Sequence, residues 1–287
     1  MIFQNFLSLL RVKHWIKNLF VFVPIFISGN FFEITLLHNS LLGFIVFSFA
    51  SSSIYIFNDL IDIERDRNHH VKKNRPLASG AISKKTAVFS IIFLLASIYV
   101  IFGYINYVGI EVVIGYLLLN VLYTFYLKHI VILDVMSISS GFVLRVMLGV
   151  MISNLELSQW LIALTFSLCM LLALGKRRAE LKLENSNTSR PALNQYNLDL
   201  ISSLQVIFVC ITIMFYMMYT IFNNNFPGNT ELLFYSSIFV IAGLARYMAI
   251  ATSESMIDEP TNIVYQDHFI LITVLSWISY IFFCLNF

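Results

Sequence analysis

The amino-acid sequence predicts an all-α polytopic membrane protein in which about nine transmembrane helices surround a central cavity open to the cytoplasm. Hydrophobic residues make up 59% of the 287 residues, the mean hydropathy is +0.81, and only 12% of the residues are charged. Soluble domains carry about 25% charged residues, so this composition excludes an ordinary soluble protein. Long apolar segments recur along the whole chain with no soluble-domain linker between them. We therefore expect one transmembrane domain over residues 1–287.

Nine apolar segments are long enough, or nearly so, to cross the hydrocarbon core of a bilayer as helices. They cover residues 16–36, 39–57, 85–105, 109–127, 130–152, 158–175, 200–222, 231–252 and 267–286. Gly29 and Asn30 interrupt the first of these segments. The spacing predicts helices joined mostly by short connections.

Lysines and arginines divide cleanly between the two sides of the predicted membrane. All but two of them, Arg145 and Arg246, fall at the N-terminus or in alternate connections: Arg11, Lys13, Lys17, Arg65, Arg67, Lys72, Lys73, Arg75, Lys84, Lys85, Lys128, Lys176, Arg177, Arg178, Lys182 and Arg190. The opposite connections hold no Lys or Arg, and their charged residues are the acids Glu33, Glu111, Glu156 and Glu231. Cytoplasmic loops carry the excess of cations. We predict a cytoplasmic (inner) membrane protein with the N-terminus and long loops inside and the C-terminus outside.

Polar residues at helical spacing mark three of the predicted helices. The fifth segment carries Asp134, Ser137, Gly141 and Arg145, the fourth carries Asn120, Tyr123, Thr124 and Lys128, and the second ends in Asn58 and Asp59. Charges within a membrane are costly and usually face a cavity or a partner. The stripes therefore predict a cavity open to the cytoplasm. An ion pair between Asp134 and Arg145 is a simpler alternative, but about three helical turns separate the two residues.

Residues 58–80 hold the strongest signal for chemistry. At helical pitch Asp59, Asp62 and Asp66 fall at i, i+3 and i+7 on one face, whereas Glu64 points roughly the opposite way. Carboxylates this close repel one another unless a cation lies between them, and Mg²⁺ prefers a few carboxylates together with phosphate oxygens. Three cations suited to phosphate follow: Lys72, Lys73 and Arg75. A solvated amphipathic turn is the alternative, but such a turn usually mixes charges on one face.

The motif Asn58-Asp59-x-x-Asp62-x-x-x-Asp66 is followed by Arg75-Pro76-Leu77-x-x-Gly80. Together they resemble the first aspartate-rich motif of the UbiA-type prenyltransferase superfamily. The resemblance covers nearly the whole chain. It implies a UbiA-like bundle of helices around a central cavity, with Mg²⁺ and a diphosphate held at the cytoplasmic mouth.

The connection between the sixth and seventh segments distinguishes the branches of that superfamily. Aromatic prenyltransferases carry a second aspartate motif of DxxxD type there, and this chain has none between Gly175 and Ser203. The chain instead reads Gly175-Lys176-Arg177-Arg178-Ala179-Glu180-Leu181 and Arg190-Pro191-x-Leu193-x-x-Tyr196, and it begins with Leu10-Arg11-x-Lys13-x-Trp15-x-Lys17-Asn18. These motifs are similar to those of the decaprenyl-phosphate phosphoribosyltransferase branch. Val12 and His70 stand where that branch has proline.

This resemblance implies Mg²⁺-dependent transfer of 5-phosphoribose from phosphoribosyl pyrophosphate to a polyprenyl phosphate, with release of pyrophosphate. The expected catalytic residues and metal ligands are Asp59, Asp62 and Asp66. The expected substrate-binding residues are Lys17, Asn58, Arg67, Lys72, Arg75, Tyr123, Lys128, Arg145, Lys176, Arg177, Glu180 and Tyr196. The expected partners are the two substrates and the membrane, with no nucleic acid, and the oligomeric state stays open.

Two alternatives remain at this point. The first is a prenyltransferase that moves an isoprenyl group from a prenyl diphosphate to an aromatic or other small acceptor. It predicts acids on both loops, whereas the second loop is rich in Lys and Arg. The second is a non-enzymatic transporter or lipid carrier, for which Asp59→Asn leaves function intact. Carboxylates at a loop–helix junction, rather than at the bilayer midplane, argue against a transporter.

Overall fold

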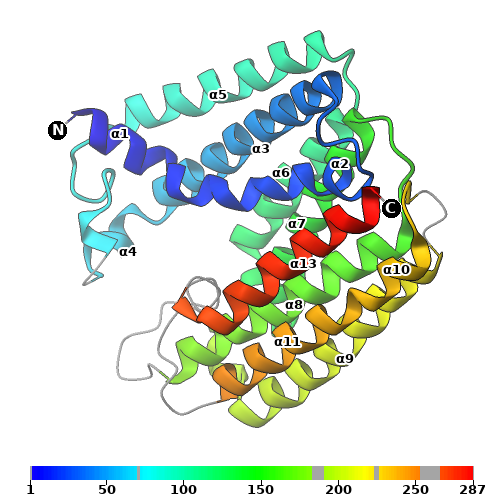
Figure 1. The fold of residues 1–287 in the computed structure, drawn as a ribbon. Helices are drawn as coiled ribbons and strands as arrows, with labels where there is room; N and C mark the ends of the chain where they lie inside the picture. The colour runs from blue at the N-terminus through cyan, green and yellow to red at the C-terminus, as the bar shows by residue number, and fades with distance from the viewer. Residues whose placement is uncertain (1, 70–71, 183–190, 223–225, 253–265, 287) are drawn as a thin grey trace. The chain divides into compact units, whose positions relative to one another are not determined.

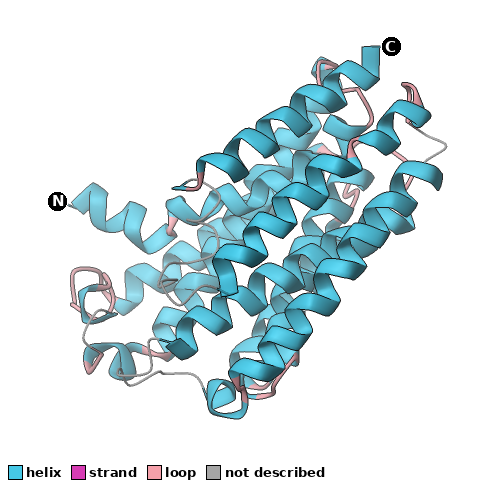
Figure 2. Ribbon diagram, turned by 60° about the horizontal axis from the view of Figure 1, so that its bottom comes forward, coloured by secondary structure: helices cyan, strands magenta, loops and turns pink. Residues whose placement is uncertain are grey.

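The computed structural model describes residues 2–69, 72–182, 191–222, 226–252 and 266–286, and every regular element within these ranges is helical (Figures 1 and 2). Seven of the described helices are long and apolar enough to cross a membrane. They cover Ile34–Ile61, Lys84–Tyr104, Leu133–Ile152, Gln159–Lys182, Leu198–Phe222, Thr230–Thr252 and His268–Leu285. A shorter apolar helix, α6, covers Ile110–Phe125. The all-α polytopic fold is confirmed, whereas the count of nine spans and the cavity stay predictions.

The first predicted span, residues 16–36, is not one helix. A 3₁₀ helix, η1 (Val12–Phe22), leads into the short α2 (Val23–Ile27), and the chain then turns before the next long helix. Gly29 has a φ of 73°, a left-handed conformation that glycine adopts without steric cost. The turn lies at Gly29 and Asn30, which already interrupt this segment in the sequence, so one predicted span is divided among η1, α2 and the start of α3.

The chain forms two compact units, which are described separately. Unit 1 comprises Met1–Ile25, Phe32–Thr124 and Leu144–Leu155, and unit 2 comprises Phe26–Phe31, Phe125–Val143 and Glu156–Phe287. Helices α6 and α7 (Leu133–Ile152) each contribute residues to both units. The single domain expected over residues 1–287 stays a prediction.

Unit 1 is organised around the long helix α3. Its elements are α1 (Ile2–Leu10), η1, α3 (Ile34–Ile61), α4 (Ile63–Arg67), η2 (Lys72–Asn74), α5 (Lys84–Tyr104), most of α6 and the second half of α7. Helix α3 packs along α5 and η1 (Figure 1). Serines line the contact with η1: Asn18 Nδ2 donates to Ser48 Oγ at 3.0 Å, and Trp15 Nε1 donates to Ser52 Oγ at 3.0 Å. Small polar residues allow this close approach and bind the helices together.

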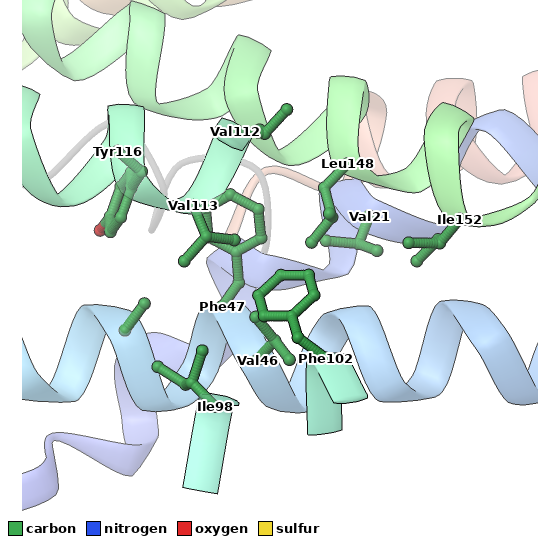
Figure 3. Close-up of a cluster of buried hydrophobic side chains, with 11 residues drawn as sticks. Val21, Val46, Phe47, Ile98, Phe102, Val112, Val113, Tyr116, Leu148 and Ile152 are labelled. Carbon is green, nitrogen blue, oxygen red and sulfur yellow. The ribbon is translucent and has the colours of Figure 1, made fainter. Parts of the chain in front are cut away.

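The apolar core of unit 1 gathers side chains from η1, α3, α5, α6 and α7 (Figure 3). Phe47 packs edge-on against Tyr116 with ring centroids 5.1 Å apart, a favourable aromatic geometry. Gly149 fixes how closely α7 approaches η1, because a Cβ there would lie 2.2 Å from the backbone oxygen of Val21. This core therefore packs together the elements that carry the polar residues of unit 1.

Unit 2 is built on the pairing of α8 with α9. Its elements are the first part of α7, η3 (Leu127–His129), α8 (Gln159–Lys182), η4 (Pro191–Gln195), α9 (Leu198–Phe222), α10 (Thr230–Tyr235), α11 (Ser237–Thr252) and α13 (His268–Asn286). Helix α11 packs along α13, and the η3 turn packs against η4. Trp277 Nε1 donates to Tyr216 Oη at 2.7 Å and ties α13 to α9. The η3–η4 contact positions the polar residues of this unit.

Candidate functional site

The aspartate stretch spans a break between two helices. Helix α3 ends at Ile61, Asp62 has φ −91° and ψ 10°, and α4 begins at Ile63. The prediction that three aspartates share one face of a continuous helix is therefore wrong. Asp59 lies on α3 and Asp66 on α4, yet both side chains are buried and converge.

Two arginines hold these converging carboxylates. Asp59 Oδ1 accepts from Arg11 Nη2 at 2.5 Å and from Arg75 Nη1 at 3.0 Å. The same Arg75 nitrogen donates to Asp66 Oδ2 at 2.6 Å. The side chains of Asp59 and Asp66 are each 4% exposed, whereas those of Arg11 and Arg75 are 22% and 30% exposed. The result is a four-residue charge cluster, the acid–guanidinium cluster, with the arginines on its open side.

Asp62 stands apart from this cluster. It is partly exposed and forms no ion pair within the described ranges. Among the described residues, no three His, Cys, Asp or Glu side chains form a group that could hold a metal ion. The three-carboxylate face expected from the sequence is thus reduced to a pair. Glu64 points away as expected, because its side chain is 77% exposed and pairs with Arg67.

The loop after α4 carries Arg75 back to the aspartates. Ser79 N–H donates to Arg75 O at 2.9 Å, and Gly80 adopts a φ of 78° that a side chain rarely permits. Arg67 Nε donates to Ala78 O at 3.3 Å and fastens the loop to α4. Lys72 lies on η2 and is partly buried. The loop from Arg75 to Gly80 is therefore tight, and it places Arg75 opposite α3.

The remaining predicted binding residues of unit 1 lie on α3, η1, α6 and α7. Asn58 Oδ1 accepts from Thr124 Oγ1 at 2.7 Å, so α6 orients its amide. Arg145 is 5% exposed, donates from Nε to Asn18 Oδ1 at 2.8 Å and lies over the Tyr116 ring, 4.9 Å from its centroid. The last two predicted residues, Lys17 on η1 and Tyr123 on α6, are partly exposed.

Unit 2 contains a second acidic centre, which is closed rather than open. Arg177 Nε donates to Asp134 Oδ2 at 2.7 Å, and their side chains are 1% and 3% exposed. Arg177 Nη1 also donates to Glu180, one turn along α8. Tyr196 Oη donates to Asp134 Oδ1 at 2.6 Å. Two predicted binding residues, Arg177 and Tyr196, thus meet at an aspartate that was not predicted, and Arg177 joins Glu180 to them. The substrate roles of these residues stay predictions.

This buried network fixes the turn between α6 and α7. Ile132 has a φ of 69°, a strained conformation for a β-branched residue, and its backbone N–H donates to Tyr196 Oη at 2.8 Å. Burial first, and then the hydrogen bond to Asp134, raise the pKa of Tyr196 far above its usual range, so the hydroxyl stays protonated. Lys128 lies on η3 in the same turn, and Lys176 is partly buried on α8.

Two residues of these centres were missed as site residues by the sequence. Arg11 belongs to the N-terminal basic motif, but nothing in the sequence pairs it with Asp59, 48 positions away. Asp134 stands first in the stripe of the fifth segment, and its partner is Arg177 rather than Arg145. Two other residues of the motifs, His70 and Arg190, lie outside the described residues.

Comparison with known proteins agrees with this architecture. Residues 19–181 match the model of the UbiA prenyltransferase family. A decaprenyl-phosphate phosphoribosyltransferase of Corynebacterium glutamicum is 34% identical over 199 residues, which are 67% of this chain and 60% of that protein. A Mycobacterium tuberculosis protein of the same name is 25% identical over 284 residues, covering 94% of this chain and 90% of the relative.

Solved structures show the same fold. A UbiA homologue from Archaeoglobus fulgidus bound to DMAPP and Mg²⁺ has a TM-score of 0.74 at 19% identity, covering 98% of this chain and 99% of that one. A digeranylgeranylglyceryl phosphate synthase has a TM-score of 0.68 at 19% identity, covering 99% and 98%. The described helices and this fold are those of a multi-pass membrane protein. The chain belongs to the UbiA prenyltransferase family.

Proposed function

We propose that the protein transfers 5-phosphoribose from phosphoribosyl pyrophosphate to a polyprenyl phosphate and releases pyrophosphate. The contrast between the two acidic centres carries this proposal. Asp59 and Asp66 converge with partly exposed cations, whereas Asp134 and Glu180 are both engaged by the buried Arg177. The second loop thus offers cations rather than a second pair of acids for a metal. The names of the relatives from Corynebacterium and Mycobacterium support the same donor and acceptor.

The residues present in unit 1 fit a magnesium ion. Oxygens of Asp59 and Asp66 already lie within 3.0 Å of one cationic nitrogen, so two carboxylates reach a common point. Mg²⁺ is usually bound by one or two carboxylates together with substrate phosphates and water. Asp59 and Asp66 would hold the ion, and Asp62 is the further candidate. When bound, the ion neutralises charge on the leaving pyrophosphate.

The chain's own cations do the rest of the work in this proposal. Arg75, with its fork of donors, binds pyrophosphate oxygens and stabilises the charge that develops as the bond to ribose C1 breaks. The lipid phosphate oxygen forms the new bond to C1, and pyrophosphate leaves with the electron pair. The lipid phosphate is already an anion, so the step needs no strong general base. A direct displacement inverts C1. The cation that binds the lipid head group is proposed to be Lys17, Lys128 or Arg145.

The location of the reaction is part of the same proposal. The lysines and arginines that flank the helices lie on one side by the alternation of spans, together with the aspartate stretch. Because cytoplasmic loops carry such an excess, we assign the N-terminus and both polar loops to the cytoplasmic side of the inner membrane. The C-terminus then lies outside.

A lipid-labelling assay tests the reaction. Purified protein in detergent is incubated with Mg²⁺, phosphoribosyl pyrophosphate labelled in the ribose, and a polyprenyl phosphate, and label is then measured in the lipid extract. Label is expected with the wild type and with Glu64→Gln, whose carboxylate is exposed and outside the cluster. No label should appear with Asp59→Asn.

A second arm of the assay separates the donor classes. The family name and the DMAPP-bound homologue favour a prenyl diphosphate as the competing donor. The arm supplies a prenyl diphosphate with aromatic acceptors in place of the ribose donor. Turnover there, with no lipid-linked ribose in the first arm, overturns the proposed donor in favour of prenyl transfer.

A further inference from the structure

The acid–guanidinium cluster is already electrically balanced. Two carboxylates, Asp59 and Asp66, face two guanidinium groups, those of Arg11 and Arg75. Arg75 Nη1 stands between oxygens of both aspartates, at 3.0 Å and 2.6 Å. A divalent cation that binds these two oxygens takes the place of that nitrogen.

Arg11 is held in the cluster by the structure of the N-terminal stretch. Its φ of 51° and ψ of 46° are left-handed, a conformation that costs an ordinary residue about 1 kcal/mol or more. The guanidinium lies over the Tyr55 ring, 4.7 Å from its centroid. Ser52 Oγ, on α3, donates to the adjacent Leu10 O at 2.7 Å. The end of α1 is thereby fixed on α3, with the Arg11 side chain directed at Asp59.

The two arginines differ from the buried arginine of unit 2 in their access to solvent. The side chains of Arg11 and Arg75 are 22% and 30% exposed, compared with 1% for Arg177. A partly solvated guanidinium can leave one anion for another without being stranded in an apolar interior. Both arginines are therefore able to exchange partners, and Arg177 is not.

We propose that Arg11 and Arg75 are exchangeable counter-ions. Without substrate they neutralise Asp59 and Asp66, and when a divalent cation arrives with a diphosphate they turn to the diphosphate oxygens. This inference rests on the proposed metal–diphosphate site and adds Arg11 to it. The exchange conserves ion pairing, because the metal takes the carboxylates while the released guanidinium groups take the anion that enters with it.

A thermodynamic consequence distinguishes this device from an ordinary binding residue. The metal alone has to displace guanidinium groups that gain no new partner, so it binds weakly. With diphosphate present the displaced groups are paired again, so the two ligands bind cooperatively. Removing an exchangeable arginine must therefore strengthen binding of the metal alone and weaken binding of the diphosphate. Removing an arginine with a merely structural role weakens binding of the metal and of the diphosphate alike.

The test measures binding of Mn²⁺, which shares the preference of Mg²⁺ for oxygen ligands, by the EPR signal of the free ion. The full-length protein in detergent is titrated with Mn²⁺ alone and with Mn²⁺ plus inorganic pyrophosphate. Arg75→Gln is expected to bind Mn²⁺ alone about tenfold more tightly and to bind pyrophosphate about tenfold more weakly, the size of one charge-assisted hydrogen bond. Arg11→Gln should shift both constants in the same directions.

Arg65→Gln is the matched control, because it removes one positive charge from the neighbouring α4 outside the cluster. It measures the effect of net charge, and its two shifts should each stay below threefold. Unchanged or weaker Mn²⁺ binding in both Arg75→Gln and Arg11→Gln overturns the inference. If one variant does not fold, judged by its thermal unfolding, the other decides the question.

The same titration separates this inference from the proposed reaction. Wild-type protein that binds Mn²⁺ and pyrophosphate cooperatively but fails to label lipid from phosphoribosyl pyrophosphate contradicts the proposed donor only. Protein that labels lipid, with arginine variants that do not strengthen binding of Mn²⁺ alone, contradicts the counter-ion exchange only.

Discussion

Unit 1 and unit 2 each contain a buried aspartate bound to arginine, and they use it in different ways. In unit 1 the arginines that bind Asp59 are partly exposed and come from connections between helices, the end of α1 and the loop after α4. In unit 2 Arg177 lies within the long helix α8 and is 1% exposed. The same pair of residue types thus forms an exchangeable site in one unit and a fixed strut in the other.

The difference follows from what happens when one partner is removed. A fully buried ion pair is costly to assemble, but breaking it by removing one charge costs about 3–5 kcal/mol because the other charge is stranded. A partly exposed charge is rescued by water instead. For these aspartate–arginine pairs, burial therefore decides whether the arginine stays with its aspartate or can leave it for a ligand. Four substitutions or conditions sharpen this comparison, in order of decreasing effect.

The largest effect is expected from the aspartates of unit 1. Asp59→Asn or Asp66→Asn removes a carboxylate that the proposal assigns to the metal, which contributes several kcal/mol to charge stabilisation. The rate of label transfer into lipid should fall at least about 100-fold, while the midpoint of thermal unfolding changes little. Glu64→Gln controls for loss of one negative charge on α4. Near-normal transfer in both aspartate variants would remove these residues from the reaction.

The next effect is on stability and belongs to unit 2. Asp134→Asn leaves the guanidinium of Arg177 without its closest buried carboxylate, so the free energy of unfolding should fall by about 3 kcal/mol. Chemical unfolding in mixed micelles measures it. Asp59→Asn is the comparison from unit 1 and should cost less than about 1 kcal/mol, because the arginines that it leaves behind, Arg11 and Arg75, are 22% and 30% exposed. Equal losses in the two variants would contradict the distinction between the units.

The third effect concerns the tyrosine that links the turn to Asp134. Tyr196→Phe removes a donor to Asp134 and an acceptor for the Ile132 N–H, so unfolding should become easier by about 1–2 kcal/mol. Ile132 then loses the contact that holds its φ of 69°. If the turn positions Lys128 for the lipid phosphate, KM for the lipid should rise more than kcat falls. A loss of kcat alone, with KM unchanged, argues against that role.

The sequence allowed the helices and the first acidic centre to be anticipated because both depend on local patterns. Apolar runs of about 20 residues indicate membrane-spanning helices, and aspartates at helical spacing indicate side chains that point the same way. Asp59 and Asp66 do converge, and the tight loop from Arg75 to Gly80 is present. The resemblance to the UbiA family, stated from the motif around Asp59, is confirmed.

What could not be anticipated depends on contacts between distant parts of the chain. The local spacing predicted that Asp62 shares a helical face with Asp59 and Asp66. The chain instead bends at Asp62, and a new helix, α4, begins at the next residue. The partners of Asp59 lie 48 and 16 positions away, and the partner of Asp134 lies 43 positions away. Tertiary packing selects such pairs. Helical periodicity places residues on a face but says nothing about which arginine faces them.

The smallest effect is expected at the salt bridge between α11 and the start of α13, which tests the comparison outside both centres. Arg246 donates from Nη2 to Asp267 Oδ2 at 2.8 Å, and its side chain is 47% exposed. Asp267 Oδ1 also accepts from the Ile270 N–H at 3.0 Å. These bonds, Arg246 first, lower the pKa of Asp267 below its usual range. Its contribution to stability is therefore complete above the ordinary aspartate pKa and is lost as the pH falls through the lowered value.

The measurement is the midpoint of thermal unfolding of wild type and Asp267→Asn at pH 7, 5 and 3. The two proteins should differ by the same small amount at pH 7 and 5, and the difference should shrink at pH 3, because the contribution of Asp267 is lost as the pH falls toward its lowered pKa. Asp134→Asn should show a large difference already at pH 7, since its partner Arg177 is buried. A loss for Asp267→Asn as large as that for Asp134→Asn would mean that exposure does not govern the strength of these arginine pairs. The distinction between an exchangeable arginine and a fixed one would then fail throughout the molecule.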